Sequence, residues 1–244
     1  MVSKPQSAVM YPGPGFRIRS SIERPDADLI AGFGRFDTPA ISDRMNRLYA
    51  MATGIRNVTD ESLSILGPAC TVKVYPGDNL MVHKSLDVAQ RGDVVVIDTS
   101  ASAMTAVLGD LISTKARHRG IAGFVVDGLV RDLEDIRALA DFPVYARGTT
   151  PIGPLHRGPG EINYPVSVGG IVVFPGDIIV GDVNGVVVIP KGIARELLDR
   201  LSAVAAKESD YVAAVRDGDF SNDWVDTVLL DAGVAFDGGG AQGA

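Results

Sequence analysis

Two short apolar runs on either side of a helical pattern restrict the fold of this chain more than any other feature. Residues 94–98 and 123–127 are rich in valine, as strands are. Between them, apolar residues recur at the spacing of one helix face, and basic residues followed by Gly120 mark the end of that helix. The residues on this face are Met104, Val107, Leu108, Leu111 and Ile112. The order strand, helix, strand predicts an α/β core with parallel strands.

The remaining patterns complete a mixed sheet. Residues 171–189 contain short apolar runs separated by tight-turn signals, which predicts an antiparallel meander. Other expected elements are a helix capped by Thr38 that continues to Tyr49, a strand over 69–74, a helix that begins near Arg131, and a long helix over 191–216. We therefore predict a single α/β domain over 17–236, an N-terminal arm at 1–16 and a flexible tail at 237–244.

The composition argues against two classes of partner. The net charge is −7, so we expect neither nucleic acid nor an anionic membrane surface to bind through bulk charge. The N-terminus lacks an apolar signal segment, and the single cysteine, Cys70, cannot form an internal disulfide. We expect a cytoplasmic protein in which an anionic substrate would need local positive charge.

Arg131 and Asp132 follow the strand 123–127 after a short turn. Ligands in open α/β sheets lie beyond the carboxyl ends of the strands, and an arginine there can hold a carboxylate or an oxo group through two hydrogen bonds. The adjacent carboxylate suits Mg²⁺ or Mn²⁺, which accept few protein oxygens together with water. The alternative is an ordinary helix cap with acidic residues in the first turn. That alternative leaves an arginine unexplained beside a positive helix end.

Gly109 and Asp110 form a second unusual position. A glycine inside a helix costs about 1 kcal/mol relative to alanine. Gly109 therefore indicates either a helix start or the close approach of another group, and simple tight packing remains an equal alternative. If the helix begins near Asp110, the amides of Leu111 and Ile112 are free donors for an anion.

These motifs together resemble one known family, the class II 4-hydroxy-4-methyl-2-oxoglutarate / 4-carboxy-4-hydroxy-2-oxoadipate aldolases, which also includes the regulator of ribonuclease activity A. The segments that carry the resemblance, within residues 38–215, are Leu108-Gly109-Asp110-Leu111, 120–128, Arg131-Asp132-x-x-Asp135, Ile41-Ser42-Asp43, 67–72 and 169–190. The resemblance implies a β/β/α sandwich of the swivelling type. It also implies homotrimers or dimers of trimers, with the site at a subunit interface.

The resemblance further implies a role for each residue of the motif. Asp132 would be the direct ligand of a divalent metal, Mg²⁺ or Mn²⁺, and Asp135 would bind it through water. Arg131 would hold the oxo group of the substrate, and Asp110 would orient a water that acts as acid or base. The amides from Gly109 through Leu111 to Ile112 would bind the pyruvyl carboxylate.

The family also takes a glutamate from the C-terminal helix of a neighbouring subunit, and Glu208 is the candidate here. Glu208 interrupts an apolar seam made of Leu197, Leu201, Val204, Tyr211 and Val215. A carboxylate on such a seam is costly unless it is paired. Its partner is either a lysine or arginine or the neighbouring site.

The expected reaction is retro-aldol cleavage of a 4-hydroxy-2-oxo acid to pyruvate, with decarboxylation of oxaloacetate as a side activity. Both reactions develop an enolate, whose charge a metal and Arg131 would stabilise. The alternatives are a non-catalytic regulator of the same fold and a lyase or hydratase that acts on another oxo acid. One departure from the family pattern is the segment 99–103, where a glycine-rich turn is common, and we expect it to reshape the pocket.

Overall fold

The computed structural model describes residue 7 and residues 9–235, and it contains two units, Met1–Leu201 and Ser202–Ala244. Each unit is described by itself. The predicted tail at 237–244 lies outside the described residues, and the predicted single domain over 17–236 stays a prediction.

Four parallel strands form the centre of the first unit: β3 (Ile65–Val74), β4 (Val94–Asp98), β6 (Gly123–Val130) and β7 (Val144–Thr149). Short strands extend this sheet on both sides: β8 (Gly160–Ile162) and β1 (Phe16–Ile18) beyond β3, and β2 (Arg56–Asn57) beyond β7. The short strand β5 (Ala106–Leu108) pairs with the end of β6. The predicted meander consists of β9 (Val166–Val168), β10 (Ile171–Val173), β11 (Ile178–Asp182) and β12 (Gly185–Ile189), paired antiparallel as β9–β10 and β11–β12. The prediction of a mixed α/β sheet is confirmed.

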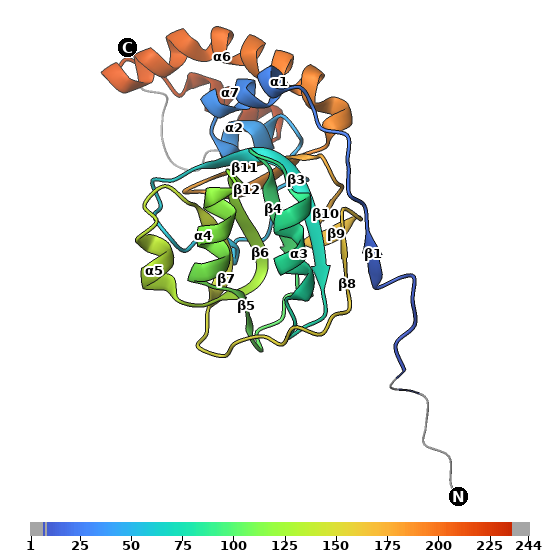
Figure 1. Cartoon of the computed structure of the whole chain (residues 1–244). Helices are drawn as coiled ribbons and strands as arrows, with labels where there is room; N and C mark the ends of the chain where they lie inside the picture. The colour runs from blue at the N-terminus through green and yellow to red at the C-terminus, as the bar shows by residue number, and fades with distance from the viewer. Residues whose placement is uncertain (1–6, 8, 236–244) are drawn as a thin grey trace, which may run out of the picture. The chain divides into compact units, whose positions relative to one another are not determined.

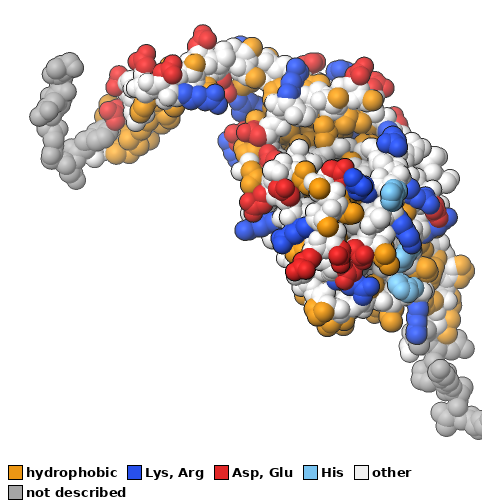
Figure 2. Space-filling model, turned by 60° about the vertical axis from the view of Figure 1, so that its left-hand side comes forward, with side chains coloured by type: hydrophobic (Ala, Val, Ile, Leu, Met, Phe, Trp, Pro, Cys, Tyr) orange, Lys and Arg blue, Asp and Glu red, His pale blue; other side chains and the backbone are white. Residues whose placement is uncertain are grey.

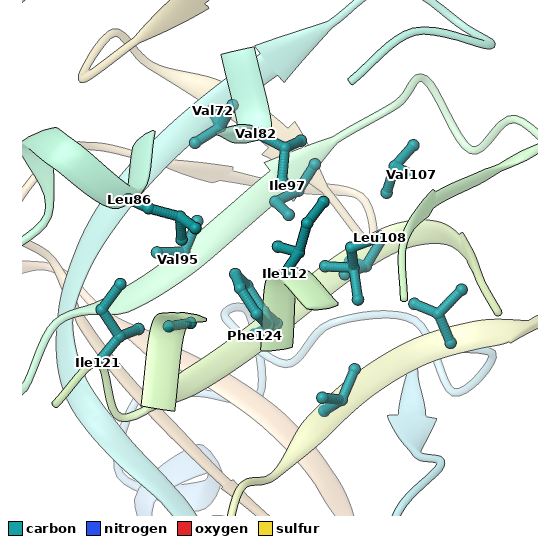
Figure 3. Close-up of a cluster of buried hydrophobic side chains, with 14 of the residues drawn as sticks. Val72, Val82, Leu86, Val95, Ile97, Val107, Leu108, Ile112, Ile121 and Phe124 are labelled. Atoms are coloured by element: carbon teal, nitrogen blue, oxygen red, sulfur yellow. The ribbon is translucent and has the colours of Figure 1, made fainter. Parts of the chain in front are cut away.

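Alternating side chains of the parallel strands enter two different cores. Val95 and Ile97 of β4 pack against α3 (Leu80–Val88) and α4 (Asp110–His118), as Figure 3 shows for the labelled residues. Val94 and Val96 point to the other face and pack with residues of β9 to β12. Burial on both faces explains the unbroken apolar runs, and each buried valine contributes about 1.5–3 kcal/mol. The strands β9 to β12, the parallel sheet and the helices form three layers, which is the expected β/β/α sandwich. The helices α3, α4 and α5 (Leu133–Arg137) lie along one side of the sheet (Figure 1).

A third core lies on the outer side of β11 and β12. It includes residues of α1 (Ala27–Gly32), the short helix η1 (Phe33–Arg35) and α2 (Thr38–Asp43), and the first turns of α6 (Ala194–Asp217), which follows η2 (Lys191–Ile193). The predicted start of α2 at Thr38 is confirmed, whereas the predicted capping residue and the predicted end near Tyr49 are wrong. Asp37 caps this helix by accepting a hydrogen bond from the amide of Ala40, and the helix stops because Asn46 and Arg47 adopt left-handed φ angles of 55° and 63°.

The predicted helix from Met104 begins later than expected. Residues 106–108 form β5, which pairs with the end of β6, and α4 begins at Asp110. The helical spacing of residues 104–108 is therefore overridden by strand pairing. The predicted end is confirmed, since Gly120 follows α4 with a positive φ of 75°.

The second unit contains the last part of α6 and α7 (Asp223–Asp231). Its apolar side chains are largely exposed, with Tyr211 59% and Trp224 61% accessible. Packing of this region on a neighbouring subunit stays a prediction. Within the described part of the chain, no helix has both the length and the apolar character that a membrane span needs.

Arg24 and Asp93 form a buried ion pair that supplies a test of this fold. The guanidinium donates to both carboxylate oxygens, at 2.8 and 2.7 Å, and Asp93 is fully buried. Arg24→Met should lower the free energy of unfolding by about 3–5 kcal/mol, because the buried carboxylate loses its charged partner. The exposed pair of Lys84 and Asp87 is the control, and Lys84→Met should cost less than about 1 kcal/mol. Urea unfolding measures both, and equal losses would contradict the prediction.

Candidate active site

A cleft of about 220 Å³ lies at the carboxyl ends of β5 and β6. One part of its lining comes from Leu108 and the first turn of α4, 109–112, and from Arg131 and Asp132 after β6. The other part consists of Asn79, His83, Pro154 and His156. Acidic, basic and histidine side chains lie close to one another on the face of the protein drawn in Figure 2. The cleft is at the sheet edge where the parallel-strand pattern predicted it.

Gly109 is required at the start of α4 because Asp132 approaches its backbone. Gly109 occupies the N-cap position and has no side chain that could cap the helix. A Cβ built on Gly109 would lie 2.2 Å from Oδ2 of Asp132 and 3.1 Å from Cγ of Arg131. A helix start and a close approach, both proposed from the sequence, are therefore found together. The first amides of α4 have no partner within the helix.

The segment Arg131–Asp132 does not act as an ordinary helix cap. The amide of Arg131 donates to the carbonyl oxygen of Leu108 at 3.0 Å, which holds this segment against β5. Asp132 precedes α5 in the left-handed conformation, with φ 54° and ψ 44°, and its carboxylate makes no capping bond with described residues. Instead, Oδ2 lies 3.2 Å from Nε of Arg131. The two side chains remain 43% and 35% exposed, so both are accessible to a ligand.

Some of the other residues predicted for the site line the cleft, and the others lie outside its described lining. Asp110, Leu111 and Ile112 line the cleft together with Gly109. Asp135 is exposed in the first turn of α5, outside the described lining of the cleft. Glu208 is exposed on the part of α6 that belongs to the second unit, so its relation to the cleft stays a prediction.

The residues of the cleft fit a divalent ion that keeps several of its water ligands better than an ion whose ligands all come from the protein. The described residues contain no group of three or more His, Cys, Asp and Glu side chains suited to hold a metal. Mg²⁺ keeps several waters and needs only one or two carboxylates, and Mn²⁺ also prefers oxygen ligands. Asp132, partly exposed and without a capping role, is a carboxylate that meets this requirement.

Sequence reasoning missed the other part of the lining. His83 and His156 belong to none of the sequence motifs, but their rings pack edge to face with centroids 5.3 Å apart. Burial lowers the pKa of the His83 imidazole below its usual range, and the charges of His156 and Lys115 lower this pKa further. The signal in the sequence was Gly77-Asp78, a second Gly-Asp pair shortly before a helix, which resembles Gly109-Asp110.

The departure at 99–103 does not reach this cleft, because none of its residues belongs to the described lining. Thr99 donates a hydrogen bond to the carbonyl oxygen of Asp127 at 2.6 Å, and it packs closely against Gly128. Ser100 and Ala101 adopt left-handed φ angles of 59° and 54°. This turn therefore anchors the ends of β4 and β6, and the expectation that it reshapes this pocket is not supported.

Comparisons with known proteins point to one family. A Halalkalibacterium halodurans protein named "Putative 4-hydroxy-4-methyl-2-oxoglutarate aldolase" is 41% identical over 198 residues, which cover 78% of this chain and 93% of that protein. A Streptomyces coelicolor structure, described as an unusual member of the RNase ES inhibitor RraA protein family, has a TM-score of 0.72 and 30% identity, covering 78% and 98% of the two chains. The RNA-processing inhibitor RraA from Thermus thermophilis has a TM-score of 0.59 and 30% identity, covering 64% and 93%.

The family model described as RraA-like (Aldolase/RraA) matches residues 38–188, which contain the parallel strands, the meander and every described residue of the cleft lining. The match covers more than half of the chain, and the relatives above agree with it. This chain belongs to the RraA-like family.

Proposed function

We propose that this protein is a divalent-metal lyase that cleaves a 4-hydroxy-2-oxo acid to pyruvate by a retro-aldol reaction, and that it also decarboxylates oxaloacetate. The observation that carries the proposal is the meeting of Arg131, Asp132 and the first turn of α4 in one cleft. A cation, a carboxylate and backbone donors are the groups that an anionic oxo acid and a metal require together. The aldolase names of several relatives support a lyase.

Each part of the cleft has a separate task in this reaction. The amides of Leu111 and Ile112 bind the carboxylate of the pyruvyl group at the positive end of α4. Arg131 donates to the oxygen on C2, where negative charge develops as the enolate forms. Asp132 would hold Mg²⁺ or Mn²⁺, which supplies a Lewis acid at the same oxygen when bound. Gly109 has no side chain and therefore leaves room for the carboxylate of Asp132.

Three further assignments belong to the proposal. Asp110 orients a water near the reacting atoms, and Asp135 contacts the metal through water. Glu208 of a neighbouring subunit completes the site, which requires a homotrimer or a dimer of trimers. The exposed apolar side chains of the second unit, such as Tyr211 and Val215, support a subunit contact there.

The second candidate function is regulation through protein contacts without catalysis. The Thermus thermophilis structure favours it, because that protein is described as an RNA-processing inhibitor, and the Streptomyces coelicolor structure is described as an unusual member of an inhibitor family. The acidic residues Asp110 and Asp132 at one cleft favour catalysis instead. A lyase or hydratase acting on another oxo acid shares the same enolate chemistry and would differ in the distal part of the pocket.

Metal removal tests the proposed activity directly. The protein should decarboxylate oxaloacetate with Mg²⁺ or Mn²⁺, and EDTA should abolish the activity. Asp132→Ala should lower kcat by at least about 10²-fold, because the ligand is lost. Glu134→Ala removes an exposed acid two residues away and should leave kcat unchanged. Activity that resists both EDTA and Asp132→Ala contradicts a metal enzyme, and no activity on any oxo acid favours the regulator.

Substitutions of Arg131, whose guanidinium can donate two parallel hydrogen bonds, supply a second test. Arg131→Ala should reduce kcat by about 10²–10³-fold, as does the loss of one donor to a developing oxyanion. Arg131→Lys keeps the charge but not the paired geometry, so its kcat should lie between those of the wild type and Arg131→Ala. Steady-state kinetics with oxaloacetate measures both variants. Equal kcat values for Arg131→Ala and the wild type would remove Arg131 from the mechanism.

A substitution at Gly109 tests the close approach of the Asp132 carboxylate to the backbone. Gly109→Ala should displace the carboxylate, because the new Cβ would lie 2.2 Å from Oδ2, and a displacement of this size can cost about 10²-fold in kcat. The apparent affinity for Mn²⁺ should fall as well. Gly192→Ala is the matched control, since its Cβ would meet no atom within 4 Å. Circular dichroism checks that both variants fold, and wild-type kinetics in a folded Gly109→Ala would contradict the assignment.

A further inference from the structure

His156 is held in the cleft by Asn79, and this contact determines which of its ring nitrogens carries the proton. Nδ2 of Asn79 donates to the carbonyl oxygen of Val107 at 2.8 Å, so the amide nitrogen faces β5. Oδ1 of Asn79 therefore faces the ring, with Nδ1 of His156 at 2.6 Å. An amide oxygen can only accept, so Nδ1 must be the protonated nitrogen and Nε2 of the neutral ring carries the lone pair.

The support for this ring is rigid. Asn79 is 2% exposed, it lies between β5 and the start of α3, and its amide is fixed by two hydrogen bonds. His83 of α3 adds an edge-to-face contact with the ring of His156. The hydrogen bond that one ring nitrogen makes sets which nitrogen is left for acid–base chemistry, and histidine is the side chain most often used for it.

The division of the cleft lining indicates what this histidine faces. In the proposed function, 109–112, Arg131 and Asp132 bind the pyruvyl half of the substrate. Among the described residues, those left to meet the C4 end are Asn79, His83, Pro154 and His156. Only the two histidines among these four have a side chain that can both accept and donate a proton. His83 has no side-chain acceptor assigned to either nitrogen by the described contacts, whereas His156 has a defined tautomer.

We propose that His156 is the catalytic acid–base residue for the C4 hydroxyl group and that Asn79 is its positioning residue. This inference rests on the proposed retro-aldol function. Nε2 takes the C4 hydroxyl proton, C4 becomes a carbonyl carbon, and the C3–C4 bond breaks. Its electron pair enters the C2–C3 enolate, which Arg131 stabilises. The imidazolium then returns the proton to C3, so that pyruvate and a second carbonyl compound leave and the histidine is neutral again.

Two reactions of one enzyme separate this role from a structural one. Oxaloacetate decarboxylation requires no proton abstraction from C4, whereas aldol cleavage does. His156→Gln should therefore lower kcat for cleavage of 4-hydroxy-4-methyl-2-oxoglutarate by about 10²–10⁴-fold. It should lower kcat for oxaloacetate decarboxylation by less than about tenfold. His118→Gln, an exposed histidine at the end of α4, is the matched control and should change neither reaction.

The outcomes distinguish the two proposals. If the wild type performs both reactions and His156→Gln slows them equally, or slows neither, the role of His156 is overturned and the lyase remains. If the wild type cleaves no 4-hydroxy-2-oxo acid, both proposals fail. The ¹⁵N chemical shifts of the imidazole supply a readout that is independent of activity. They should show Nδ1 protonated in neutral His156 and a loss of this preference in Asn79→Leu, and protonation at Nε2 in the wild type would overturn the assignment.

Discussion

The pairing of β4 with β6 is the interaction on which the rest of the structure depends. Both strands are buried on both faces, and their register runs without a break from Val94 opposite Gly123 to Asp98 opposite Asp127. A parallel pair requires a crossover, and the right-handed twist of strands directs its helix to one face of the sheet. α4 is part of that crossover. The carboxyl ends of the strands and the beginning of α4 are thereby brought to one edge, where the cleft lies.

The geometry of the cleft follows from a second pairing. β5 joins the end of β6, with Ala106 opposite Leu129 and Leu108 opposite Val130. The residues that follow these two strands must then be neighbours, which places Gly109 beside Asp132. The missing side chain at 109 lets the carboxylate approach the backbone where the first amides of α4 begin. Strand register therefore sets the distance between the first amides of α4 and the acidic group.

The fold was more predictable from the sequence than the site. The runs at 94–98 and 123–127 predicted β4 and β6 because burial on both faces leaves a strong apolar signal. The sequence predicts helix where β5 lies, because the helical spacing of Met104, Val107 and Leu108 carries no sign of the partner strand β6. The motif residues around Gly109 and Arg131 are close in sequence to strand ends and were found. Asn79 and His156 are 77 positions apart along the chain (156 − 79), and their contact depends on a loop path that no local pattern encodes.

The conformation of Asp132 argues for a ligand at this site. A left-handed φ in a non-glycine residue is uncommon and costs free energy, although aspartate tolerates it better than most residues do. Asp132 gains no described capping bond in return, and its partner Arg131 stays 43% exposed. Gly109 adds a further cost through the conformational freedom of glycine in the unfolded chain. A fold that only had to present a surface to a protein partner would gain stability from asparagine or glycine at 132. The combination is explained when the carboxylate and the guanidinium are kept in place for a small charged ligand, as a lyase requires.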